Sequence, residues 1–139
     1  MYKELITEVS KGNEFVKIQP PCPGSEIDRV EKSFGYPLPK EVRALLSELN
    51  GDKFLLLSAE EIIDQIRLNK EMLSYYEEQG VEGVDRLLFF AGNGCGDYYC
   101  YRVGDENTIY MWEHEEMKYD RKVAASMSEV ITRYYNDEI

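Results

Sequence analysis

Hydrophobic residues recur three or four positions apart in the first half of the chain, which is the spacing of amphipathic helices. In the second half they gather in continuous or alternating runs rich in aromatic and β-branched residues, which is typical of strands. We predict helices over residues 2–11, 25–35, 39–50, 58–79 and 126–136. We predict strands over residues 54–57, 87–91, 98–103 and 108–115, with a short extended piece at 15–18.

The residues that flank these segments support the predicted boundaries. Ser25 is an N-cap candidate, because its hydroxyl can accept a backbone N–H of the first turn. Pro39 suits a first helical position, where its missing N–H would be unpaired anyway. Ser58 and Glu61 have the spacing of a capping box. The Gly104–Asn107 segment between two predicted strands favours a hairpin turn.

The order of these segments predicts the fold class. Helices precede an antiparallel meander, which favours an α+β fold over a doubly wound parallel sheet. We expect a single domain over residues 1–139, with a central, mostly antiparallel sheet and helices packed around it. Residues 87–115 should hold at least three strands, and the two helices at 25–50 should lie against the sheet or its edge.

Composition is that of a globular protein in a reducing compartment. The 139 residues are 43% hydrophobic and 31% charged, and no apolar run approaches the roughly 20 residues that span a bilayer. The first twelve residues, MYKELITEVSKG, lack the apolar core of a secretory signal. Cys22, Cys95 and Cys100 cannot all pair within one chain, so we expect free thiols and a cytoplasmic protein.

The charge of the chain bears on the kind of partner that it can bind. Its net charge is −11, and the charged residues are unevenly distributed along the sequence. Residues 1–74 carry ten Lys and Arg against thirteen Asp and Glu, whereas residues 75–139 carry six against fourteen. The second part also holds nine of the eleven tyrosines and the single tryptophan. Such a surface repels phosphate backbones, so direct nucleic-acid binding is disfavoured. It attracts a basic protein instead, although acidity that only maintains solubility is an equally simple alternative.

The Gly92–Asp97 loop is the first candidate for chemistry, because its three alternate glycines resemble a nucleotide-binding loop. A dinucleotide fingerprint needs strand, loop and helix in that order, so that phosphate meets a helix N-terminus. Here a strand follows the loop and no Lys–Ser/Thr pair is present, which favours a tight connection between strands. We expect Asp97 to cap that turn by accepting backbone N–H groups.

Cys95 and the single histidine, His114, are a second candidate, as a thiolate–imidazole pair. No third orienting group is evident, and a structural cysteine is the simpler interpretation. His114 lies between Glu113 and Glu115, but strand alternation points it away from both. The three cysteines lack the paired spacing of a zinc site. We therefore predict no catalytic residue, no metal site and no cofactor.

Aromatic residues dominate two of the predicted strands. Tyr98, Tyr99, Tyr101, Tyr110 and Trp112 are interpreted either as cross-strand packing or as part of a binding face. The second interpretation arises because tyrosine and tryptophan are enriched at protein interfaces.

Three short motifs stand in order along the chain. The first consists of Ile27, Glu31, Gly35, Leu38, Pro39, Leu45, Leu46, Asn50 and Gly51. The second is the step Gly96-Asp97 before a strand, and the third is the run Val123-Ala124-x-Ser126 into the last helix. In this order they resemble the motifs of the SUKH superfamily, shared by fungal Smi/Knr-type cell-wall regulators and many bacterial immunity proteins. The resemblance covers most of residues 25–135, and one departure is Val42, where the family commonly has an aromatic residue.

This resemblance implies an α+β fold with a central antiparallel sheet. For the bacterial branch it implies a non-catalytic immunity protein, or antitoxin, that binds and neutralises a polymorphic toxin, frequently a nuclease. The expected partner is a cognate toxin, basic and encoded nearby, with no role for a membrane. We expect an acidic, tyrosine-containing partner surface drawn from Glu77, Glu78, Asp105, Glu106, Glu113, Glu115, Glu116, Tyr98, Tyr110 and Trp112.

Two other classes of function stay open. The first is a regulator or adaptor of the Smi/Knr cell-wall type, which acts through protein partners without a toxin. The second is an enzyme or small-ligand binder centred on the Gly92–Asp97 loop. That second class needs a deep pocket with Cys95, His114 and an acid within hydrogen-bond distance.

Overall fold

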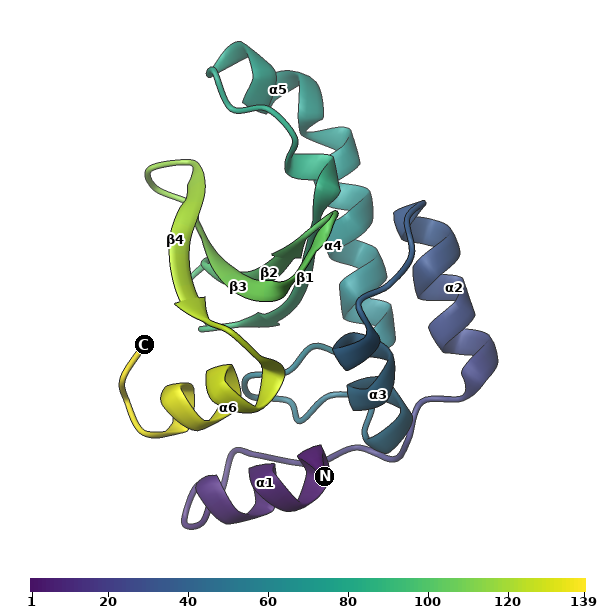
Figure 1. The fold of residues 1–139 in the computed structure, drawn as a ribbon, viewed down its shortest axis with the longest axis vertical. Coiled ribbons are helices and arrows are strands. Elements are labelled where there is room, and N and C mark those ends of the chain that lie inside the picture. Colours follow the sequence, from purple (N-terminus) through teal and green to yellow (C-terminus); the bar gives the residue numbers. More distant parts are fainter.

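The computed structural model describes residues 1–139 as six α-helices, one turn of 3₁₀ helix and one four-stranded sheet. The helices are α1 (Tyr2–Val9), α2 (Gly24–Phe34), α3 (Lys40–Glu48), α4 (Ala59–Glu71), α5 (Leu73–Glu78), η1 (Val84–Arg86) and α6 (Met127–Tyr135). The strands are β1 (Leu87–Gly92), β2 (Tyr98–Arg102), β3 (Asp105–Glu113) and β4 (Lys118–Ala124). The fold class is α+β, as the sequence predicts, and Figure 1 shows a curved sheet with helices packed around it.

The sheet is an antiparallel meander in which each strand pairs with the next one along the chain. The predicted strands at 87–91, 98–103 and 108–115 are present, but β3 begins at Asp105, so the predicted four-residue turn shortens to Val103-Gly104. The fourth strand, β4, has no counterpart among the predicted strands. It forms the sheet edge, and only Val123 and Ala124 at its end are buried, so it lacks an apolar pattern.

The predicted short strand at 54–57 and the predicted extended piece at 15–18 do not form strands of the sheet. The piece at 54–57 makes a single antiparallel bridge from Leu56 to Ala91, beside β1. Around that bridge the Leu57 N–H donates to the Phe90 carbonyl and the Gly92 N–H donates to the Leu55 carbonyl, both at 2.9 Å. The piece at 15–18 is irregular, although the Lys17 N–H donates to the Asp52 carbonyl at 2.8 Å in the loop that follows α3.

The helix boundaries differ from the prediction at several points. Helix α2 begins one residue early, at Gly24, with Pro23 as its N-cap, so the prediction that Ser25 caps it is wrong. Pro39 is the N-cap of α3 rather than its first residue. The Ser58–Glu61 capping box at the start of α4 is confirmed, with both reciprocal bonds formed. The predicted helix over 58–79 is divided at Met72 into α4 and α5.

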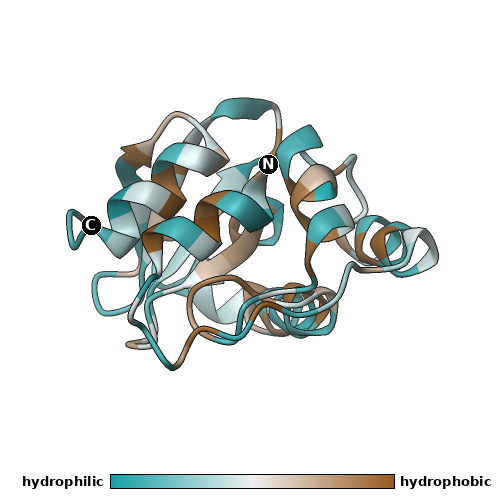
Figure 2. Ribbon diagram, turned by 90° about the horizontal axis from the view of Figure 1, so that it is seen from below, coloured by the Kyte–Doolittle hydropathy of each residue, from teal (hydrophilic) through white to brown (hydrophobic).

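The two faces of the sheet pack against different layers. One face joins the main core with the apolar stripes of α1, α2, α3, α4 and α6, and hydrophobic segments alternate with hydrophilic ones along these helices (Figure 2). The opposite face, here called the α5-side face, carries Leu87, Phe89, Cys100, Tyr110 and Trp112. These five side chains form a smaller cluster whose cover comes from α5, η1 and the segment between them.

Candidate functional site

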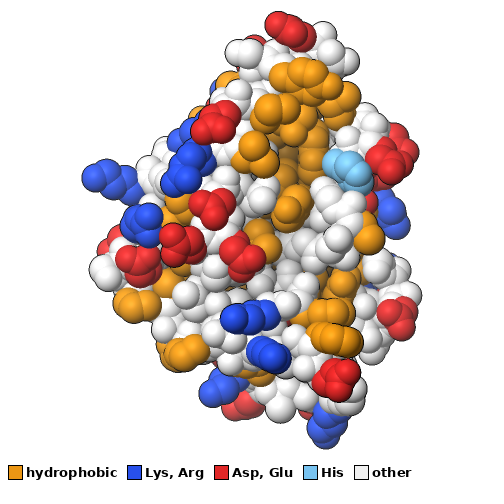
Figure 3. All heavy atoms as spheres, turned by 180° about the vertical axis from the view of Figure 1, so that it is seen from behind, with side chains coloured by type: hydrophobic (Ala, Val, Ile, Leu, Met, Phe, Trp, Pro, Cys, Tyr) orange, Lys and Arg blue, Asp and Glu red, His pale blue; other side chains and the backbone are white.

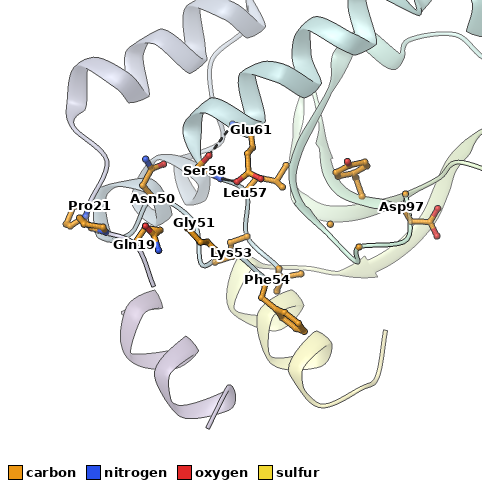
Figure 4. A pocket seen from close by; sticks show the side chains of 17 residues that line it. Gln19, Pro21, Asn50, Gly51, Lys53, Phe54, Leu57, Ser58, Glu61 and Asp97 are labelled. Atoms are coloured by element: carbon orange, nitrogen blue, oxygen red, sulfur yellow. Dashed lines mark hydrogen bonds between the residues drawn. The ribbon is translucent and has the colours of Figure 1, made fainter. Parts of the chain in front are cut away.

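A cleft of about 790 Å³ opens between three loops. Its walls come from residues 19–21, from the 50–58 loop between α3 and α4, and from the 92–98 loop between β1 and β2. Figure 4 shows Gln19 and Pro21 on one side and Asp97 on the other, with Ser58 and Glu61 at the start of α4 between them. The cleft is therefore bordered by two of the three sequence motifs.

A buried carboxylate, that of Asp52, holds the 50–58 loop. Its Oδ1 accepts the backbone N–H groups of Phe54, Leu55 and Leu56 at 2.8–2.9 Å. Its Oδ2 accepts the Tyr135 hydroxyl at 2.7 Å, which links the loop to α6. Burial, together with this bond, raises the pKa of Tyr135 above its ordinary value. Asp52 is fully buried, so its four partners are what makes a charged group tolerable there.

The Asn50-Gly51 step has a structural role at the same loop. Asn50 Oδ1 accepts the Ala59 N–H at 2.7 Å and so satisfies a free donor in the first turn of α4. Gly51 has a φ of 84°, and a Cβ there would lie 2.9 Å from the Ser58 nitrogen and 3.0 Å from the Leu56 oxygen. Only glycine fits this position without moving the backbone.

The Gly92–Asp97 loop is joined to the end of β3. Asp97 Oδ1 accepts the His114 backbone N–H at 3.0 Å and lies 2.6 Å from His114 Nδ1. The prediction that Asp97 caps its own turn is therefore wrong, and Asn93 accepts the Cys95 N–H at 2.9 Å instead. Gly96 permits this contact, since a Cβ there would lie 3.0 Å from the His114 ring.

The two side chains of this pair shift each other's titration. The hydrogen bond to Asp97 raises the pKa of His114 above its ordinary value. Burial alone would raise the pKa of Asp97, but the hydrogen bonds from His114 outweigh it and hold that pKa below its ordinary value. Both groups are therefore charged over a wider pH range than they would be at their ordinary pKa values.

Cys95 and His114 do not form the arrangement that an enzyme at this loop would need. Cys95 is exposed, and the His114 ring nitrogen nearest the loop contacts Asp97. The cleft is lined by Asp97, whereas Cys95 and His114 are not among its lining residues. No group of three or more His, Cys, Asp or Glu side chains is placed to hold a metal ion. Cys22 and Cys100 are buried and unpaired.

The predicted acidic residues fall into two groups. Glu77 and Glu78 at the end of α5 are exposed, as are Glu115 and Glu116 in the turn between β3 and β4. Glu113, the last residue of β3, is half-buried. None of these five carboxylates forms a hydrogen bond or an ion pair with another side chain, so they are free to meet a partner.

Asp105 and Glu106 differ, because both stabilise the fold. Asp105 Oδ2 accepts the Tyr110 hydroxyl at 3.0 Å. Glu106 Oε1 accepts the Lys40 N–H at 2.7 Å, and this places a negative charge at the N-terminus of α3, where the helix dipole favours it. Both carboxylates are thus engaged within the chain, although Glu106 stays exposed, and their part in a partner surface stays a prediction.

Two of the three aromatic residues that were predicted for the partner surface are buried. Trp112 and Tyr110 are only 3% and 6% exposed on the α5-side face, so they are packing residues and not surface anchors. Tyr98 is partly exposed and stacks on Phe89 with ring centroids 4.9 Å apart. Of the three, only Tyr98 can touch a partner without rearrangement. Cross-strand packing is therefore the correct interpretation for Tyr110 and Trp112.

The sequence analysis names Tyr98 but misses Leu68, Met72, Tyr75 and Tyr76, which lie near it along α4 and α5. Gln65 Nε2 donates to the Tyr98 hydroxyl at 3.2 Å, and the Tyr76 ring meets the Trp112 ring edge-on at 5.2 Å. Together Leu68, Met72, Tyr75, Tyr76 and Tyr98 are here called the apolar band. Figure 3 shows hydrophobic side chains gathered in such a band on the face opposite to that of Figure 1.

The sequence profile of the SMI1 / KNR4 family (SUKH-1) matches residues 21–133, which is most of the chain. The chain belongs to this family. A crystal structure of a protein from Pseudomonas syringae pathovar tomato has a similar fold, with a TM-score of 0.55 and 16% identity. The match covers 91% of this chain and 92% of that one. A search of curated proteins finds no significant match. No helix of this SUKH-1 protein has the length and apolar character needed to cross a membrane.

In this SUKH-1 domain the first motif holds the connection between α2 and α3. Glu31 Oε2 accepts the Leu38 N–H at 2.9 Å, and its Oε1 lies 3.0 Å from Arg43 Nη2. The Leu38 hydrogen bond holds the pKa of Glu31 below its ordinary value. Ile27, Leu38 and Pro39 are buried beside it. These residues of the motif therefore stabilise the connection between α2 and α3.

Proposed function

We propose that this SUKH-1 protein is a non-catalytic immunity protein that binds and neutralises a basic toxin domain, such as a nuclease. The observation that carries the proposal is the family itself, whose bacterial branch includes immunity proteins. An immunity protein acts by occupying its toxin, so it needs a surface and no reacting groups.

The free acidic residues support a basic partner. Glu77, Glu78, Glu115 and Glu116 are exposed at two tips of the molecule, and Glu113 lies beside the second of these. A basic nuclease cleft attracts such carboxylates at long range, which raises the association rate. Charge pairs that become desolvated at the interface contribute up to several kcal/mol each.

Co-expression with the product of the neighbouring coding sequence, followed by a pull-down, tests the immunity role. We expect a stable complex with a toxin domain whose activity is lost when this protein is bound. A neighbouring product that neither binds nor is inhibited would count against immunity.

Association kinetics across a salt series test the acidic surface. The variant Glu113→Gln/Glu115→Gln/Glu116→Gln should associate more slowly and with a flatter salt dependence, because steering charges are screened over about 10 Å at 0.1 M salt. The matched control is Glu4→Gln/Glu8→Gln/Glu14→Gln, which removes three exposed acids on or just after α1. Equal salt slopes in the two variants would show that the turn between β3 and β4 lies outside the interface.

A regulator or adaptor of the Smi/Knr type is the second candidate function. It uses the same protein-binding character of the family but requires no toxin. The co-expression experiment separates the two, because a regulator leaves a neighbouring toxin active.

A further inference from the structure

The apolar band lies along α4 and α5 and extends onto the sheet at Tyr98 of β2. Leu68 and Tyr75 are 47% and 46% exposed, which is unusual for large hydrophobic residues in this chain. Gln65, Leu68, Met72 and Tyr75 follow one another at three- and four-residue steps, which places them along one side of α4 and α5. The buried stripe of α4, which includes Ile62 and Ile66, faces the main core instead. The helix pair therefore presents a second stripe, in which Leu68 and Tyr75 are exposed and Met72 is half-buried.

Rigid aromatic rings lie beneath and beside this stripe. Tyr76 packs edge-on against Trp112 at 5.2 Å, and Phe89 lies between Trp112 and Tyr98 at 6.2 and 4.9 Å. The Gln65 amide fixes the Tyr98 hydroxyl from α4. Side chains that are already held in place lose little conformational entropy when a partner docks on them. The band thus has the preorganised character of a binding surface.

The charge of the segment that holds α5 and the first three strands favours one kind of partner. Residues 75–119 carry ten Asp and Glu against three Lys and Arg, for a net charge of −7. One of the three cations, Arg102, is occupied, since its guanidinium stacks 3.6 Å from the Tyr110 ring centroid and donates to the Tyr119 carbonyl. A segment with acidic flanks would be repelled by this surface, and one with lysine or arginine would be attracted.

We propose that the apolar band is the docking surface for a partner segment that carries apolar side chains flanked by lysine or arginine. The assignment of that segment to a toxin rests on the proposed immunity function. Leu68, Met72 and Tyr75 contact the apolar side chains, and Tyr98 extends the contact towards the cleft. The exposed acids at the end of α5 and in the turn between β3 and β4 meet the basic flanks.

Two matched substitutions separate the effect of the band on binding from the effect of net charge. Leu68→Lys places a cation in the middle of the band, and Phe15→Lys places one at an exposed hydrophobic residue after α1. Both raise the net charge by one and both act at exposed side chains, so neither should change thermal stability appreciably. With the toxin, Leu68→Lys should raise the Kd by about tenfold or more, as expected for a central contact, and Phe15→Lys should leave it within about twofold.

A synthetic amphipathic peptide of leucine and lysine tests the surface without a toxin. Trp112 is the only tryptophan and lies under the band, so its fluorescence reports occupancy of this face. We expect the peptide to change Trp112 emission in the unsubstituted protein and in Phe15→Lys, with binding at least about tenfold weaker in Leu68→Lys. A peptide with glutamate in place of lysine should have no effect. Equal binding by both lysine variants, or no Trp112 response, overturns the proposed surface.

The two arms distinguish failure of the surface from failure of the immunity role. A toxin that binds Leu68→Lys as tightly as the unsubstituted protein refutes docking on the band and leaves immunity intact. A neighbouring product that fails to bind, together with a leucine–lysine peptide that docks on the band, refutes immunity and supports the surface.

Discussion

Replacing Gly51 with alanine perturbs the turn on which the cleft wall and the start of α4 both depend. Gly51 has a φ of 84°, a region that L-residues avoid at a cost of about 1–2 kcal/mol. The added Cβ would also lie 2.9 Å from the Ser58 nitrogen, 3.0 Å from the Leu56 oxygen and 3.2 Å from the Leu57 carbonyl carbon. All three are backbone atoms, so no side-chain rotation relieves the contact.

The expected loss of stability combines these two effects. Overpacking in a well-packed region costs about 1–3 kcal/mol, so Gly51→Ala should lower the free energy of unfolding by about 3 kcal/mol in total. Any shift that relieves the contact also disturbs the Asn50 bond to α4 and the Asp52 bonds to residues 54–56. The loss should therefore lie at the upper end of the effects of single substitutions.

Gly80→Ala is the matched control for this prediction. Gly80 has the same φ of 84°, but nothing lies within 4 Å of a Cβ built there. It should cost only the conformational part, about 1–2 kcal/mol. The difference between the two variants then measures the backbone contact alone.

Urea unfolding followed by the fluorescence of Trp112 measures both variants. We expect unchanged slopes and a midpoint that falls further for Gly51→Ala than for Gly80→Ala. In thermal unfolding each kcal/mol corresponds to about 4 °C for a domain of this size. If the two variants lose equal stability, the close contacts at Gly51 do not constrain the loop and the structural reason for the Asn50-Gly51 motif is wrong.

Two further predictions concern buried or paired charges. NMR titration should find the pKa of His114 above its ordinary 6.5, and Asp97→Asn should return it towards 6.5; an unchanged value would mean that the pair does not exist in solution. The stabilisation from His114 is complete below pH 6.5 and is lost as pH rises through its raised folded pKa, whereas that from Asp97 is present above pH 3.8 and is lost as pH falls through its lowered folded pKa. Asp52→Asn should lower the free energy of unfolding by about 3 kcal/mol, because a fully buried acceptor of four hydrogen bonds becomes part donor, while Tyr135→Phe should cost about 1 kcal/mol. Urea unfolding compares the two, and equal losses would show that the backbone bonds to Asp52 contribute little.

The sequence by itself determined the elements whose signals are local. The apolar stripe of α2 and the capping box of Ser58 and Glu61 depend on residues within one or two turns, so spacing alone predicts them. The continuous apolar run of β1 is recognisable for the same reason, since all six of its residues are buried. The order of these elements was then enough for the α+β class.

Tertiary structure alone decided the features that join distant residues. Glu106 meets Lys40 across 66 residues, and Asp97 meets His114 across 17, so neither partner is visible from local spacing. Strand β4 is defined by pairing with β3, because an edge strand with mostly exposed side chains carries no apolar pattern. The burial of Trp112 also depends on tertiary structure. A tryptophan suits either a core or an interface, and only the packing of α5 and the sheet around Trp112 buries it, whereas Leu68 of α4 stays exposed. Whether a residue is buried depends on which other residues pack against it, and these neighbours come together only in the folded chain.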